Sequence, residues 1–85
     1  MPPGTPVDPN LARVLRAARE KQGRSQEAVA HDAGLTVTAL ARIERAQANP
    51  TWTTVLQILG ALGLSLQQLA DLLPRAADDH IVQAE

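Results

Sequence analysis

The sequence predicts an all-α domain of five short helices, and three observations carry this prediction. The 85 residues suffice for one small domain, and 45% of them are hydrophobic. Most of these are Ala and Leu, which favour helices, whereas Trp52 is the single aromatic residue and strands favour aromatics. Five times along the chain, a helix-capping residue precedes an apolar stretch that a helix-breaking residue ends.

The first predicted helix begins at Asp8 and Pro9, because Asp is a good N-cap and Pro suits the first helical position. It runs to about Gln22, and Gly23 can close it in the left-handed conformation. Its apolar stripe consists of Leu11, Val14, Leu15 and Ala18.

Only a short turn separates the next two predicted helices. Ser25 caps a helix over about residues 26–33, and Gly34 stops it. Thr36 then caps a helix over about residues 37–46. The sequence Asn49-Pro50 follows and forces a loop.

Two further helices complete the predicted domain, which spans residues 8–73. Thr51 caps residues 52–62, which Gly63 closes, and Ser65 caps residues 66–73, which Pro74 terminates. Residues 1–7 are rich in Pro and Gly and are predicted to be a disordered N-terminal arm, while residues 74–85 are predicted to be an acidic flexible tail.

Composition excludes several kinds of protein. The chain has no cysteine, which rules out a disulfide scaffold and a thiolate metal site. No apolar run is long enough to cross a membrane, so we expect a cytoplasmic protein without a membrane partner. The net charge is −1, yet residues 11–60 hold seven basic and four acidic residues, a net charge of +3.

The glycine between the second and third helices indicates a helix-turn-helix. A sharp turn between steeply crossed helices needs a positive φ, which glycine adopts without steric cost. Counting Gln26 as position one, small Ala30 is fifth, where the two helices would touch, and Gly34 is ninth. Leu40 and Ile43 lie three residues apart on one face of the third helix and would pack under the second.

The opposite face of the third helix is small, polar and basic. At about 100° per residue, Thr38, Ala41, Arg42 and Arg45 cluster away from Leu40 and Ile43, and Val37 stands at the exposed N-terminal end. Such a face can approach another surface closely and probe it with an arginine.

At this point the sequence resembles the Cro/phage-repressor (XRE) type of helix-turn-helix protein, over about residues 10–73. The resemblance implies a five-helix lambda-repressor-like DNA-binding domain. The shared pieces are Ser25-Gln26-Glu27, Ala30, Ala33-Gly34-Leu35-Thr36, Arg42-Ile43-Glu44, Asn49-Pro50 and Ala61-Leu62-Gly63-Leu64-Ser65.

The resemblance assigns roles to individual side chains. The third helix is expected to enter the major groove of double-stranded DNA and to contact bases through Val37, Thr38, Ala41 and Arg42. Phosphate contacts are expected from Gln26, Arg45 and Asn49. Arg19 and Glu44 match a partly buried ion pair that joins the first helix to the third, which agrees with the position of Glu44 beside the core face.

The function expected from this resemblance is that of a sequence-specific transcriptional regulator, most simply a repressor acting as a homodimer on a pseudo-palindromic operator. It would work in the cytoplasm on the nucleoid. We find no catalytic arrangement, no metal-ligating set and no need for a cofactor. Leu64, Leu72 and Leu73 would either form a dimer surface or close the core, and Trp52 would either pack or contact a second subunit.

Three departures from the family pattern follow the third helix. Ala46 replaces the usual glycine, which leaves the form of that turn open. Gln47 and Ala48 stand where members often carry Lys or Arg, so each subunit would make fewer phosphate contacts and bind more weakly.

Two alternatives stay open at this level. One is an antitoxin that also regulates its own operator and binds a toxin through its flexible termini, so a protein partner held by the tail is part of that hypothesis. The other is a module that bridges proteins without binding specific DNA, which the acidic overall balance would suit.

Overall fold

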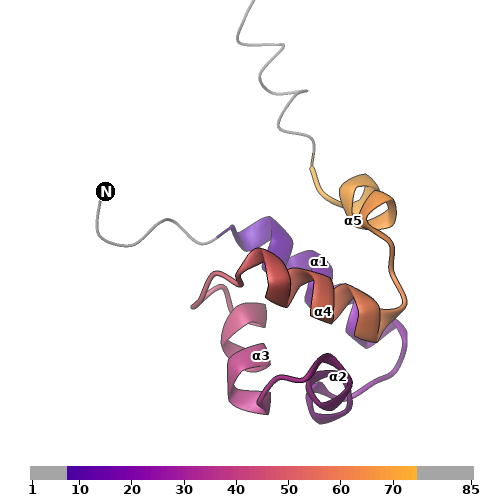
Figure 1. Ribbon diagram of the computed structural model, residues 1–85. Coiled ribbons are helices and arrows are strands. Elements are labelled where there is room, and N and C mark those ends of the chain that lie inside the picture. Colours follow the sequence, from indigo (N-terminus) through magenta and orange to yellow (C-terminus); the bar gives the residue numbers. More distant parts are fainter. Residues whose placement is uncertain (1–7, 75–85) are drawn as a thin grey trace, which may run out of the picture.

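The computed structural model describes residues 8–74, which form five α-helices and no strand. In chain order these helices are α1 (Pro9–Lys21), α2 (Gln26–Ala33), α3 (Val37–Glu44), α4 (Trp52–Leu62) and α5 (Leu66–Leu72). Helices α2 and α3 lie on one side of the molecule and α5 on the opposite side, with α1 and α4 between them (Figure 1). The predicted all-α class with five helices is confirmed.

All five helices begin where the capping residues predicted. The side chain of each N-cap accepts a hydrogen bond from the backbone N–H two or three residues later, which satisfies a donor that the helix itself leaves free. The five N-caps are Asp8, Ser25, Thr36, Thr51 and Ser65.

Three helix ends differ from the predictions. Helix α1 ends at Lys21 with Gln22 as its C-cap, and α3 ends at Glu44, two residues before the predicted limit. Helix α5 ends at Leu72, because Pro74 disfavours helical backbone at Leu73, whose ψ is 144°.

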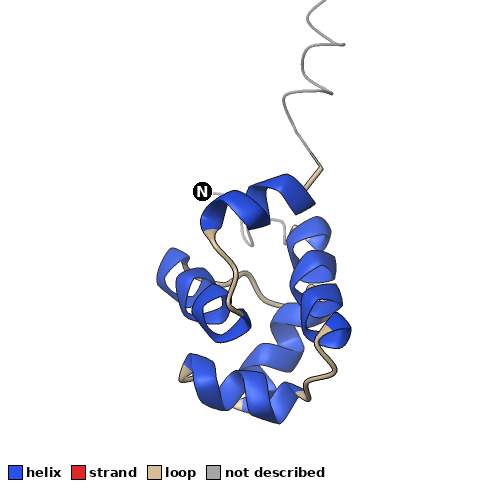
Figure 2. Ribbon diagram, turned by 90° about the vertical axis from the view of Figure 1, so that its right-hand side faces the viewer, coloured by secondary structure: helices blue, strands red, loops and turns tan. Residues whose placement is uncertain are grey.

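The core lies between α1, α2, α3 and α4, and its most buried large side chains are Leu15, Val29, Leu40 and Ile58. Helix α2 packs most closely against α4, and small Ala30 and Ala33 are buried on its inner face. Small residues let these two helices approach closely. Figure 2, a view turned by 90°, shows the helices joined by short loops.

Helix α5 is held much more lightly. Only Leu69 is buried on it, while Leu66 and Leu72 are 47% and 54% exposed. Trp52 at the start of α4 is 63% exposed, so it does not pack into the core of the domain.

No single helix within residues 8–74 is long and apolar enough to cross a membrane. Helices α4 and α5 reach that length and composition only together, across a bend of 95°. The predicted N-terminal arm, and the predicted tail beyond Pro74, lie outside the described residues.

Candidate nucleic-acid interface

The turn from α2 to α3 positions the third helix. Gly34 adopts a φ of 74°, and the N–H of Leu35 donates to the carbonyl of Ala30 at 2.8 Å, which closes α2. Two residues after the glycine, Thr36 caps α3 through a 3.0 Å bond from the N–H of Ala39. In this arrangement Leu40 and Ile43 are buried in the core, and the opposite face of α3 points outward.

Three of the four expected base-contacting residues lie on that outward face. Thr38 and Arg42 are exposed, and Val37 is 39% exposed at the N-terminal end of the helix. Within residues 8–74, the guanidinium of Arg42 makes no hydrogen bond or ion pair to another side chain. Its five N–H donors are therefore available to a ligand.

Ala41 is placed differently from the expectation, because its side chain is buried and only 9% exposed. It lies three residues before Glu44, and helix residues three apart share a face. Arg19 of α1 and Gln26 of α2 bond to Glu44 at the edge of this face, where the two helices approach α3. Ala41 therefore exposes much less of its side chain on this face than Val37 does.

The residues expected at phosphates are spread around α3. Arg45 is exposed beyond the last turn, where its Nε donates to Oε1 of Gln47 at 3.1 Å. Asn49 is exposed and lines a shallow hollow together with Arg42 and Thr51. Gln26 is half-buried at the first position of α2, and it lines a different hollow, together with Val37.

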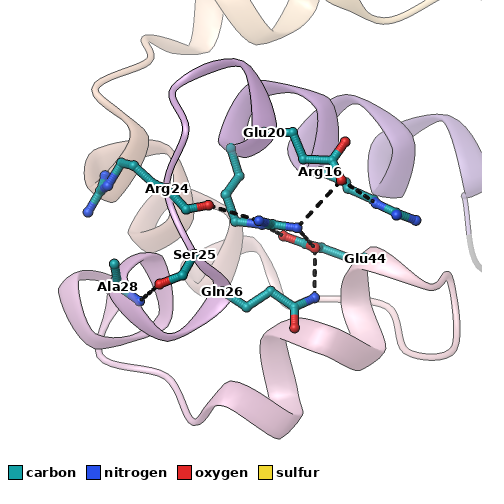
Figure 3. A network of polar contacts seen from close by, with 8 residues as sticks. Arg16, Glu20, Arg24, Ser25, Gln26, Ala28 and Glu44 are labelled. Atoms are coloured by element: carbon teal, nitrogen blue, oxygen red, sulfur yellow. Dashed lines mark hydrogen bonds and ion pairs between the residues drawn. The ribbon is translucent and has the colours of Figure 1, made fainter.

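An ion pair joins α1 to α3. Arg19 donates to Glu44 through Nε, 2.8 Å from Oε2, and through Nη2, 3.0 Å from Oε1 (Figure 3). The side chain of Glu44 is only 2% exposed and that of Arg19 12% exposed. The hydrogen bond from Arg19 to Glu44 raises the pKa of Arg19, against the lowering effect of burial, so this guanidinium stays charged. The structure thus brings together the two residues that the resemblance paired.

The same cluster holds further bonds that sequence reasoning missed. Nε2 of Gln26 donates to Oε1 of Glu44 at 2.9 Å, and Nη1 of Arg19 donates to the backbone carbonyl of Arg24 at 2.9 Å. One carboxylate therefore ties α3 to both α1 and α2, and it sets the angle at which α3 is presented.

The loop between α1 and α2 also caps the distant end of α4. Nε2 of Gln22 donates to the carbonyl of Leu62 at 2.7 Å, and Nη1 of Arg24 donates to that of Ala61 at 2.6 Å. Arg24 also pairs with Asp32. A helix C-terminus attracts cations and N–H donors, but no sequence spacing links residues 40 positions apart, so these partners were not predictable.

The turn after α3 keeps the shape that glycine usually gives it, although the residue is alanine. Ala46 has a φ of 58° and is the only non-glycine residue with positive φ among those described. The N–H of Gln47 donates to the carbonyl of Arg42 at 2.8 Å, and that of Ala46 to Ile43 at 3.1 Å. This bond pattern closes a helix whether or not glycine is present, and it ends α3 earlier than predicted.

Comparison with known proteins agrees with this geometry. A family model described as helix-turn-helix matches residues 15–72, which is most of the chain. The chain belongs to the helix-turn-helix family of the XRE type. The sequence matches no curated protein at a significant level.

Solved structures of similar fold include two restriction-modification controller proteins. The chain is 30% identical to C.AhdI from Aeromonas hydrophila, over 72% of this chain and 92% of that one, with a TM-score of 0.69. It is 25% identical to wild-type C.Esp1396I, over 75% of this chain and 82% of that one, with a TM-score of 0.73. A further similar structure shows C.Esp1396I as a tetramer in complex with its natural 35 base-pair operator, at 25% identity over 75% and 84% and a TM-score of 0.73.

This helix-turn-helix protein is a DNA-binding transcriptional regulator. Regulators of this family are typically non-enzymatic. Within residues 8–74, no three His, Asp or Glu side chains gather as a metal site would require.

Proposed function

We propose that this helix-turn-helix protein is a sequence-specific repressor that binds a pseudo-palindromic operator as a homodimer. The observation that carries the proposal is the outward face of α3, where exposed Thr38 and unengaged Arg42 stand beside Val37. A helix that presents a few such side chains can lie in the major groove and read base edges.

The base contacts that we propose come from Val37, Thr38 and Arg42. Arg42 would donate two hydrogen bonds to O6 and N7 of a guanine, which discriminates by about 1–3 kcal/mol. The methyl groups of Val37 and Thr38 would contact a thymine methyl. Each half-site would therefore contain a guanine and a nearby thymine.

The phosphate contacts that we propose come from Arg45, Asn49 and Gln26. Arg45 and Asn49 lie beyond the C-terminal end of α3, and Gln26 lies at the start of α2. These positions come from two different segments beside α3, so their contacts would hold the helix in the groove at more than one point. Gln26 would use the amide N–H that Glu44 does not take.

The subunit contact that we propose lies on the other side of the molecule. Leu72 and Leu64 line an apolar groove with Val14, Ala17 and Ala18 of α1, and α5 covers this groove only in part. Leu73 is half-buried against the core beside it. A second copy that paired through this groove would leave both α3 helices free for DNA (Figure 1).

The similarity to C.AhdI bears on which kind of operon this repressor would control. Similarity over 92% of a restriction-modification controller protein favours control of a restriction-modification operon as the setting of this repressor. The antitoxin and bridging alternatives have no comparable observation behind them.

The proposal is tested by selection from a random duplex DNA pool at low salt, followed by sequencing. The wild-type protein should enrich an inverted repeat whose half-sites are centred roughly 34 Å apart. Folded protein that enriches no sequence would refute sequence-specific binding and favour the bridging module.

The variant Arg42→Ala tests the base contact that we propose for this residue. Because Arg42 is exposed and bonds to no described side chain, its loss should abolish specific enrichment and leave the melting temperature unchanged. Arg13→Ala is the matched control, since Arg13 is also exposed but lies on α1 and bonds to Asn10. The control should select the wild-type site. A destabilised Arg42→Ala would show instead that Arg42 supports the fold.

A further inference from the structure

The amide of Gln26 has a defined orientation. A carboxylate accepts hydrogen bonds and cannot donate them. Both oxygens of Glu44 accept, Oε2 from Arg19 Nε at 2.8 Å and Oε1 from Arg19 Nη2 at 3.0 Å and Gln26 Nε2 at 2.9 Å. Gln26 must therefore turn its amino group toward Glu44 and its carbonyl oxygen away, as Figure 3 shows.

The carbonyl oxygen of Gln26 is left without a partner. No hydrogen bond within residues 8–74 occupies it, and that part of the chain contains no buried polar side-chain atom lacking a partner. The oxygen is therefore open to solvent, as an acceptor held in place by the bond between Nε2 and Glu44.

Gln26 lies at the end of the interface that would read bases. It lines one open hollow together with Ser25, Glu27 and Val37, between the first residue of α2 and the first residue of α3. Val37 is an apolar residue, so it offers no hydrogen bond of its own to a base edge. Arg19, Ser25 and Glu27 also line this hollow, and the carbonyl oxygen of Gln26 is the acceptor there that a bond to Glu44 orients.

The chemistry of this acceptor excludes a phosphate as its ligand, because phosphate oxygens accept hydrogen bonds too. In the major groove the available base donors are the N6 amino group of adenine and the N4 amino group of cytosine. We infer that the carbonyl oxygen of Gln26 reads a base amino group at the operator, with Glu44 as the positioning residue that orients it. This inference rests on the proposed function and adds a base contact to it.

The test compares wild-type protein with Gln26→Met in the same random-pool selection. Methionine keeps the length of the side chain and removes both the acceptor and the donors. The variant should lose its preference at one base pair in each half-site and keep the preferences that Arg42 sets. Arg45→Ala is the matched control for a phosphate contact, and it should weaken binding to all sequences alike and lower the salt slope by about 1.

Base analogues identify the donor. At the base pair whose preference is lost, purine in place of adenine, or pyrimidin-2-one in place of cytosine, removes only the amino group. The analogue should cost the wild-type protein about fivefold in affinity, the worth of one hydrogen bond. It should cost Gln26→Met nothing, because that variant has already lost the contact.

A third variant, Glu44→Gln, tests the positioning role. An amide at residue 44 can accept or donate, so it no longer dictates which way the amide of Gln26 faces. Assayed well below its melting temperature, Glu44→Gln should lose preference at the same base pair as Gln26→Met. A purely structural role for Glu44 would lower affinity for every sequence equally.

The outcomes separate the two proposals. A wild-type protein that selects no site refutes the proposed function, and this inference falls with it. Two other outcomes overturn this inference and leave the proposed function standing. In the first, the wild-type protein selects a site and Gln26→Met keeps the same base preferences. In the second, neither analogue lowers the affinity of the wild-type protein for its site.

Discussion

Glu44 shows how much a single residue contributes to this domain. It is the one charged residue in the buried class among residues 8–74, and its carboxylate accepts bonds from α1 and α2 while belonging to α3. Burying a carboxylate costs several kcal/mol unless charge and hydrogen bonds compensate it. Here Arg19 supplies the charge, and Arg19 and Gln26 together supply the hydrogen bonds.

Glu44→Ala should lower the free energy of unfolding by about 3 kcal/mol, because it leaves the guanidinium of Arg19 buried without its main partner. Glu20→Ala is the control, since Glu20 pairs with Arg16 at 3.1 Å where both side chains are more than half exposed, and it lies 3.9 Å from Arg19 without a hydrogen bond to it. The control should lose less than about 0.5 kcal/mol. Urea denaturation followed by circular dichroism measures both. Equal losses would contradict a special role for the buried pair.

Ala46 marks a residue whose backbone is strained. A non-glycine residue in the left-handed region costs roughly 1–2 kcal/mol, and glycine avoids most of that cost. Ala46→Gly should therefore stabilise the protein by about 0.5–1 kcal/mol, a rise of a few degrees in the melting temperature. Ala48→Gly, at a position with negative φ in the same loop, should give no such gain. A melting temperature that rises for both variants, or for neither, would refute strain at Ala46.

Among the elements, α4 contributes more buried hydrophobic residues than any other described helix, and it still contains a weak point. Gly60 lies inside the helix and is exposed, and a Cβ built there would meet no atom within 4 Å. Glycine inside a helix costs about 0.5–1 kcal/mol relative to alanine.

Gly60→Ala should therefore raise the free energy of unfolding by about 0.5–1 kcal/mol. Gly34→Ala is the contrasting variant. A Cβ built at Gly34 also meets no atom within 4 Å, but the φ of 74° strains an alanine there. Gly34→Ala should therefore lower the free energy of unfolding by about 1 kcal/mol. Thermal melts of both variants test the difference, and a Gly60→Ala that melts below wild type would show that the space beside α4 is needed for something else.

At the scale of the whole molecule, charged residues are distributed unevenly along the domain. No charged residue occurs between Arg45 and Asp71, a stretch that contains α4 and most of α5. Three large hydrophobic side chains are exposed there, namely Trp52, Leu56 and Leu66, and exposed Leu72 directly follows Asp71. Exposed apolar side chains that gather into a patch mark an interaction surface, and Leu72 lines the groove that we propose for the subunit contact.

Leu72→Glu should abolish the proposed dimer without unfolding the subunit, because Leu72 lines the groove and is already 54% exposed. Sedimentation velocity should give a monomer, and operator affinity should fall about 100-fold as the linked second half-site is lost. Leu56→Glu is the control, since Leu56 is 42% exposed on α4 and lies outside the groove. A monomeric Leu56→Glu beside a dimeric Leu72→Glu would move the interface to the exposed face of α4.

The five helices and the family could be predicted from the sequence, because both depend on residues close together along the chain. Ser25 and Thr36 begin helices through bonds to backbone N–H groups three positions away. The turn at Gly34 needs only a positive φ. The outward position of Thr38 and Arg42 follows from helical periodicity together with the burial of Leu40 and Ile43.

The contacts between distant segments could not be predicted from the sequence, because they form only when the helices pack together. The burial of Ala41, the exposure of Trp52 and the capping of α4 by Gln22 and Arg24 depend on which helices meet, and periodicity within one helix does not encode that. The orientation of Gln26 is such a case as well, because it is set by a carboxylate that folding brings from 18 residues away. Side-chain hydrogen bonds require positions defined to a fraction of an ångström, and such positions exist only once the helices have packed.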